Sequence, residues 1–254
     1  MIDRQVQELF YKATGTPPFE EPLPLNVENS IGSFHLSHDI LSVRLAGSHT
    51  SVESARKVVE PFLNAWELEA EIIDGFPVIE FEFLGANELG NTRFNLFKLR
   101  KLMAVTADDK KIAAEDTLVI RRTKYPDPPT IRITPEMVNI WSRFKNARLD
   151  IRETFQSCAY YCLTVIERSA GGRRSAAKQY HIDVSVLSKL GELTSVRGDP
   201  ESARKALANH AAPLTRLERK WIDHTIRKII YQLGLVAASV HPPNLSLSDL
   251  PDLS

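Results

Sequence analysis

Hydrophobic residues recur along this chain with two periods, that of a helix in some segments and that of a strand in others. Apolar residues at helical spacing predict a short opening helix over residues 2–13, which ends at Gly15. Residues 16–30 are rich in proline and glutamate, so they predict an extended acidic connector that cannot be helical.

The next segment has alternating patterns that predict strands. Leu41, Val43 and Leu45 alternate with polar residues and predict a half-buried strand. Thr50 and Glu53 predict a capping box that opens a helix ending near residue 66. Further strands are expected over 68–72, 78–84, 101–107 and 117–123. The order is β-α-β-β, an antiparallel hairpin with a third strand reached across a helix.

Glutamates alternate with apolar residues in the two strands expected at 68–72 and 78–84. They are interpreted as the solvated face of a sheet, since no histidine or aspartate joins them at the spacing of metal ligands. The residues are Glu67, Glu69, Glu71, Glu80 and Glu82.

After Pro129 the pattern becomes helical. Thr134 and Pro135 have the residue types of an N-cap and a first helical position. Thr215 and Glu218 predict a second capping box, which opens a last helix over about 216–238. Between them we expect a long helix over 149–169 that ends at Gly171 and Gly172, a short helix, one capped by Asp183, and one over 200–209.

These patterns predict the α+β class, with an acidic sheet part followed by a basic, all-helical bundle. The expected organisation is an N-terminal helix and connector over 1–30, a sheet domain over 31–129, a helical bundle over 130–240, and a tail over 241–254. The tail contains spaced leucines and prolines, so it is either an extended strap along the surface or disordered.

The net charge of zero hides a split between the two parts. Residues 1–129 carry 14 basic and 20 acidic side chains, whereas residues 130–240 carry 18 basic and 10 acidic ones. Either the two parts face each other or each faces a different partner. A protein partner or a second copy is expected, and nucleic acid is an alternative through residues 168–228.

The sequence predicts a cytoplasmic protein without a membrane span. The start of the chain lacks the apolar core of a secretory signal, and no apolar run reaches the roughly 20 residues that a membrane helix needs. Cys158 and Cys162 lie four apart on one helical face, where core packing is the interpretation, since two ligands do not make a zinc site. Neither a metal nor a cofactor is expected.

Two short motifs in the helical part pair arginine with histidine. Arg219 precedes His224 by five positions, and Arg204 precedes His210 by six. This spacing resembles the signature of the HEPN family, helical bundles that often cleave RNA. The resemblance implies that the arginine and histidine lie in a cleft between two protomers, where they polarise a phosphate and position a 2′-hydroxyl. On a straight helix, however, Arg219 and His224 diverge by about 140°, which favours two solvated side chains.

The segment from Gly171 to Ser175 is a candidate anion site. Gly172, Arg173 and Arg174 bring a glycine, free N–H groups at a helix start and two guanidinium groups together. The alternative is a helix stop with solvated arginines, because the segment matches neither the P-loop nor the dinucleotide fingerprint.

Longer stretches of the chain resemble a bacterial family sometimes labelled methylamine utilisation protein J. They are VEPFLNAWELEAEI, RRTKYPDPP, CLTVIERSAGGRR, VLSKLGELTSVRGD and PLTRLERKWI. The resemblance spans most of residues 40–238 and implies no activity, cofactor or catalytic residue. The sequence therefore favours a non-enzymatic interaction or accessory protein, with an RNA-directed HEPN-like protein as the alternative.

Overall fold

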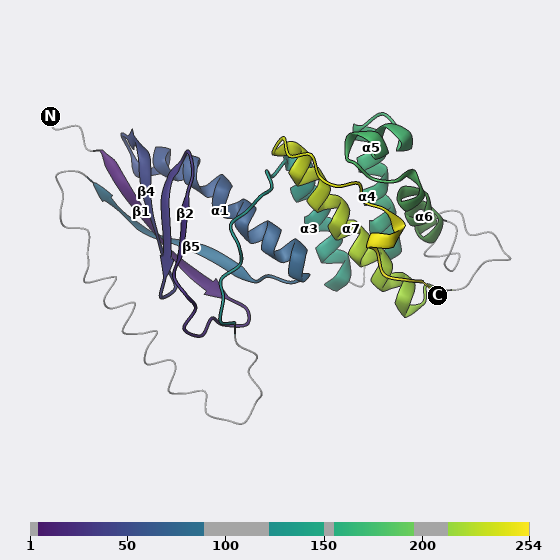
Figure 1. Ribbon diagram of the computed structural model, residues 1–254, viewed down its shortest axis with the longest axis horizontal. Helices are drawn as coiled ribbons and strands as arrows, with labels where there is room; N and C mark the ends of the chain where they lie inside the picture. The colour runs from purple at the N-terminus through teal and green to yellow at the C-terminus, as the bar shows by residue number, and fades with distance from the viewer. Residues whose placement is uncertain (1–4, 89–121, 150–154, 196–212, 254) are drawn as a thin grey trace, which may run out of the picture. The chain divides into compact units, whose positions relative to one another are not determined.

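The computed structural model describes residues 5–88, 122–149, 155–195 and 213–253. Its backbone contacts divide the chain into two compact units, residues 1–129 and 130–254, which are described in turn (Figure 1). The first unit contains an antiparallel sheet with one long helix, and the second is helical, so the predicted α+β class is confirmed.

The sheet of the first unit has five strands in the order β2-β3-β4-β1-β5. Their bounds are β1 Val6–Gly15, β2 Leu25–Glu28, β3 Gly32–Ser37, β4 Ile40–His49 and β5 Ile79–Glu88. All neighbouring pairs are antiparallel, and β1 lies between β4 and β5. The predicted strands at 41–45 and 78–84 are thus confirmed as parts of β4 and β5.

Helix α1 (Val52–Asp74) covers one face of this sheet. Trp66 and Leu63 of the helix share a core with alternate strand residues such as Leu9, Phe34 and Val43. On the opposite face of the sheet, residues such as Arg44, His35 and Glu82 are exposed. The segment after residue 121 belongs to the same unit, because Trp66 Nε1 donates to the Pro126 carbonyl at 3.1 Å.

Three local predictions for this unit are wrong. The predicted opening helix is strand β1, in which Val6 and Leu9 are both buried because a bulge between Val6 and Glu8 shifts the alternation. The predicted strand over 68–72 continues α1, which carries Glu67, Glu69 and Glu71 on a helix rather than a sheet. The capping box is formed by Ser51 and Ser54, one residue beyond the predicted pair.

The second unit contains helices α3 (Pro135–Leu149), α4 (Phe155–Ser169), α5 (Arg173–Gln179), α6 (Val184–Ser195) and α7 (Arg216–Ala237). The N–H of Met137 donates to the Thr134 hydroxyl, which confirms the predicted start of α3. The predicted cap pair Thr215 and Glu218 is also confirmed. The strands expected at 101–107 and at most of 117–123, and the helix expected from Pro200, lie outside the described residues.

The core of the helical unit includes Trp221 and Ile226 of α7, Phe144 of α3 and Leu187 of α6. None of the helices in the described ranges is long and apolar enough to cross a membrane. Residues 241–253 do not continue α7 but fold back beside it as an extended strap, one of the two forms expected for the tail (Figure 1).

Candidate binding surface

Helix α7 presents a row of basic side chains on the side away from its core. At about 100° per residue, Arg216, Lys220, His224 and Arg227 fall within about 80° of one another. Arg216 and Lys220 are exposed, as are the flanking Arg219 and Lys228. We call the exposed residues Arg216, Lys220 and Lys228 the basic face of α7, since they fall within about 120° of one another. Arg219 lies about 180° from Lys228, and Arg227 is ion-paired to Asp223.

Burial of the opposite side of α7 determines which side of the helix faces solvent. Trp221, Ile222, Ile226 and Ile229 are buried. At the start of the helix the main-chain N–H of Thr215 donates to Glu218 Oε2 at 2.8 Å, and the N–H of Glu218 donates to the Thr215 hydroxyl at 3.2 Å. Apolar burial and the cap together hold the cations toward solvent.

His224 lies within this cationic row. Burial lowers the pKa of its imidazole, and the nearby charges of Arg227, Lys228 and Lys220 lower it further, against an opposing effect of Asp223. A histidine near neutral pH therefore stays uncharged here. Three cations thus oppose protonation of His224, and one carboxylate favours it.

The predicted Arg219–His224 pair does not line one cavity. Arg219, Lys220 and Asp223 line a hollow of about 350 Å³ together with Ala147 and Phe155, and His224 is not part of its wall. Asp223 Oδ2 accepts a hydrogen bond from Arg227 Nε at 3.1 Å, so the charge of Arg227 already has a partner. The second candidate pair, Arg204 and His210, lies outside the described residues.

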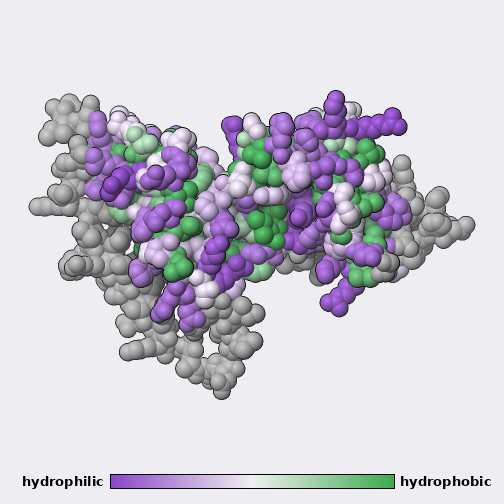
Figure 2. Space-filling model, viewed as in Figure 1, coloured by the Kyte–Doolittle hydropathy of each residue, from purple (hydrophilic) through white to green (hydrophobic). Residues whose placement is uncertain are grey.

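The segment Gly172–Arg174 is placed at the start of α5. Gly171 and Gly172 have φ of 79° and 123°, in the region that favours glycine, and they turn the chain from α4 into α5. Arg173 Nε donates to Glu167 Oε1 at 2.5 Å, so its charge already has a partner. Arg174 and Lys178 are exposed, and hydrophilic atoms project beyond α5 in Figure 2.

Cys158 and Cys162 are both free thiols in the core of the helical unit, as their predicted positions on the buried stripe required. A hydrogen bond with Cys158 and then burial raise the pKa of the Cys162 thiol well above its usual range. Within the described ranges, no three histidine, cysteine or carboxylate side chains are grouped as metal ligands.

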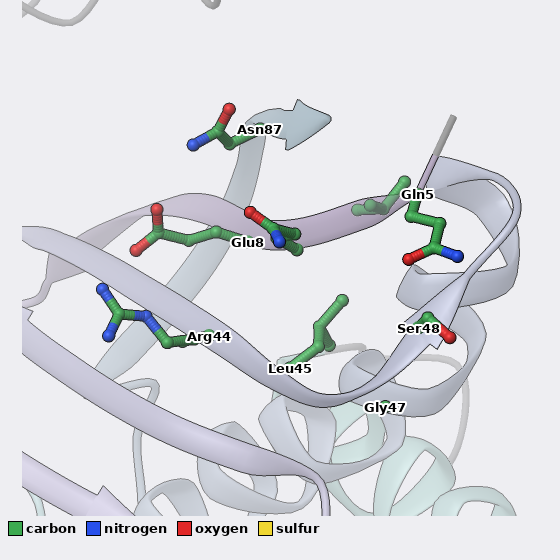
Figure 3. A pocket seen from close by; sticks show the side chains of 9 residues that line it. Gln5, Glu8, Arg44, Leu45, Gly47, Ser48 and Asn87 are labelled. Carbon is green, nitrogen blue, oxygen red and sulfur yellow. The ribbon is translucent and has the colours of Figure 1, made fainter. Parts of the chain in front are cut away.

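A second hollow, of about 410 Å³, opens within the sheet (Figure 3). Val6 pairs with His49 and Glu8 with Arg44, so β4 has three more residues than β1 between these pairs, and the strands separate. Leu45 points into the gap, and Gln5 and Ser48 lie at one end of it (Figure 3). Sequence reasoning missed this hollow, because the register slip that opens it depends on pairs of residues that are 36 and 43 positions apart.

Comparison of the chain with family models, with curated proteins and with solved structures finds no match. The resemblances to the methylamine utilisation protein J group and to HEPN proteins therefore stay predictions.

Proposed function

We propose that this protein is a non-enzymatic interaction or accessory protein that binds an acidic protein partner through the basic face of α7. The observation that carries the proposal is the row of exposed cations along one side of α7, formed by Arg216, Lys220 and Lys228. Such a surface attracts acidic partners over distances near the Debye length of about 8 Å at physiological salt.

The geometry of α7 gives less support to RNA cleavage. The HEPN-like mechanism needs an arginine and a histidine that converge on one phosphate, whereas Arg219 lines a hollow from which His224 is absent. Helix α7 itself offers no stacking platform for single-stranded bases, since its two aromatic residues are the buried Trp221 and the half-buried Tyr231. RNA binding through phosphates alone is the second candidate function.

The test is affinity capture of the full-length chain from its native cells, with and without nuclease. The double variant Arg216→Glu/Lys220→Glu reverses two exposed cations of the basic face. The matched control, Lys57→Glu/Lys124→Glu, makes the same change of charge at two exposed lysines of the sheet unit. We expect one acidic protein to be retained after nuclease, and the first variant to recover at least tenfold less of it than the control.

The same variants separate the proposal from nucleic-acid binding. Purified protein is titrated with two unrelated RNAs and one duplex DNA between about 50 and 200 mM salt. We expect weak binding of all three that falls steeply with salt, because phosphate contacts release counterions. Capture that disappears with nuclease, sequence-selective RNA binding at 200 mM salt, or RNA cleavage that His224→Ala abolishes would overturn the proposal.

A further inference from the structure

The strap, residues 241–253, lies against α7 and the turn between α5 and α6, and we call the surface that it covers the groove. Two main-chain hydrogen bonds of 2.8 Å join Leu245 to this turn, one from its N–H to the His181 carbonyl and one from the Asp183 N–H to its carbonyl. They make a parallel bridge between Leu245 and Ile182, the pairing by which extended peptides add to a backbone edge.

Side chains also form hydrogen bonds between the groove and the strap. Gln232 of α7 is buried, and its amide donates to the Pro243 carbonyl at 2.9 Å. The Asn244 amide donates to the Asp183 carboxylate. The strap is thus held by hydrogen bonds to its main-chain and amide groups. These hydrogen bonds require the strap to be extended rather than helical.

Three apolar side chains anchor the strap at intervals. Pro242, Leu245 and Leu250 are buried, whereas Leu247 between them is 45% exposed. Between the last two anchors, residues 247–249 form a 3-10 turn, capped by Ser246 and Asp249. The Asp249 carboxylate accepts a hydrogen bond from the Ser246 N–H at 2.8 Å. Hydrogen bonds from Ser246 lower the pKa of this carboxyl, and the charge of Lys228 in the basic face lowers it further.

We propose that the groove beneath the strap is a peptide-binding site that takes an acidic, leucine-containing segment of the partner protein in place of the strap. The incoming segment presents a proline and two leucines at the spacing of Pro242, Leu245 and Leu250, with a carboxylate facing Lys228. This inference rests on the proposed function, and it makes the strap a covalently tethered competitor of the partner.

The strap is suited to exchange because its contacts match those that a peptide in trans can make. Its main-chain pairing to the turn runs through one residue, Leu245. Its side-chain hydrogen bonds include one at the surface, from Asn244 to Asp183, and one from the buried Gln232 to the Pro243 carbonyl. A tether next to its own site gives the strap an effective concentration in the millimolar range. A partner segment therefore binds tightly only when the strap is weakened or when further contacts to the basic face add to its affinity.

The experiment uses the full-length chain and a fluorescein-labelled peptide with the sequence of residues 241–254. Binding is measured by anisotropy to the wild type and to Leu245→Asp, which places a charge in the apolar anchor site and releases the strap. We expect the peptide to bind Leu245→Asp at least tenfold more tightly than the wild type. A control peptide in which both buried leucines are aspartate is expected to bind neither protein.

A hydrogen-exchange measurement on the wild type keeps the test decisive if Leu245→Asp does not fold. The amides of Leu245 and Asp183 are expected to exchange at least 100-fold faster than the amide of Ile226, because the strap opens without unfolding α7. Equal exchange rates would overturn the proposal, as would equal peptide affinities of the two proteins. Dimers of Leu245→Asp or of the wild type linked by exchanged straps would also overturn it, since a second copy would then be the occupant.

The outcomes separate this inference from the proposed function. If the peptide fails to bind but Arg216→Glu/Lys220→Glu still recovers less of the partner, the groove is not the binding site. The basic face then remains the proposed binding surface. If the charge reversal leaves capture unchanged, the proposed function fails whatever the peptide does.

Discussion

The carboxylate of Glu67 on α1 accepts a hydrogen bond from the main-chain N–H of Phe81 on β5, with 2.6 Å between nitrogen and oxygen. Among the described strands, β5 pairs with β1 on one side only. A helix side chain thus satisfies a donor that lies outside the described ladder. The carboxylate is partly buried in this position, and burial raises the pKa of Glu67. The hydrogen bond from Phe81 opposes that rise.

Glu67→Gln is expected to keep the hydrogen bond, because the amide oxygen also accepts, and to remove the cost of burying a charge. The folded pKa of Glu67 lies above its unfolded value, so the native state binds more protons between the two and wild-type stability falls as pH rises through that window. Denaturant unfolding from pH 4 to pH 7 should therefore show a smaller fall for Glu67→Gln.

The contrasting variant is Glu67→Ala, which leaves the Phe81 N–H without its carboxylate partner. We expect it to lower the free energy of unfolding by about 1–2 kcal/mol at neutral pH. If Glu67→Ala and Glu67→Gln are equally stable, the hydrogen bond contributes nothing and the edge is satisfied by water.

For His224 in the helical unit we expect the opposite dependence of stability on pH. Its folded pKa lies below the unfolded value near 6.5, because burial and neighbouring cations oppose its protonation. The unfolded state then binds more protons between the two pKa values, so stability falls as pH drops below about 6.5. His224→Gln should lose less stability than the wild type between pH 7 and pH 5 in thermal unfolding, and matched loss in both proteins would contradict this.

The sequence predicts the fold class and most of the helical unit, because helix caps are local signals. Thr134 and Thr215 identify the starts of α3 and α7 from residues within one turn. The strands at 41–45 and 78–84 are equally local, since their alternation is not interrupted. Such signals need no knowledge of the partner element.

The errors arise where tertiary pairing changes the pattern. The bulge in β1 spaces Val6 and Leu9 by three residues, which imitates a helix. In α1, Leu68, Ala70 and Ile72 alternate with glutamates and imitate a strand, although Glu69 between them is buried. The basic residues of α7 could be identified from the sequence, but the strap groove could not, since its backbone edge at Ile182 and its anchor Leu245 are 63 residues apart.

Gly234 on α7 lies where the helical unit has no room for a side chain. A Cβ at this position would lie 2.7 Å from Ile131 Cβ and 2.9 Å from Met137 Cε. Helix propensity alone favours alanine over glycine by about 1 kcal/mol. The overlap with Ile131 lies close to its backbone and outweighs this gain, so we expect Gly234→Ala to lower stability by about 1–2 kcal/mol.

The control for this steric effect is Gly47→Ala in the first unit, where an added Cβ meets no atom within 4 Å. Chemical unfolding of the two variants should show a loss for Gly234→Ala and a change within about 0.5 kcal/mol for Gly47→Ala. A more stable Gly234→Ala protein would show that Ile131 moves away from α7 without cost.

Cys158 and Cys162 are predicted to be structural thiols. Both are fully buried, and the raised pKa of Cys162 keeps it protonated at pH 8, so neither is expected to react with a thiol reagent before unfolding. Cys162→Ala should cost less stability than Cys162→Ser, because serine buries a hydroxyl that needs a stronger acceptor than the Ile140 carbonyl at 3.9 Å provides. We expect about 1–3 kcal/mol for serine, measured by chemical unfolding. Rapid labelling of either thiol in the native protein, or stoichiometric zinc in the purified protein, would instead indicate an accessible or metal-bound pair.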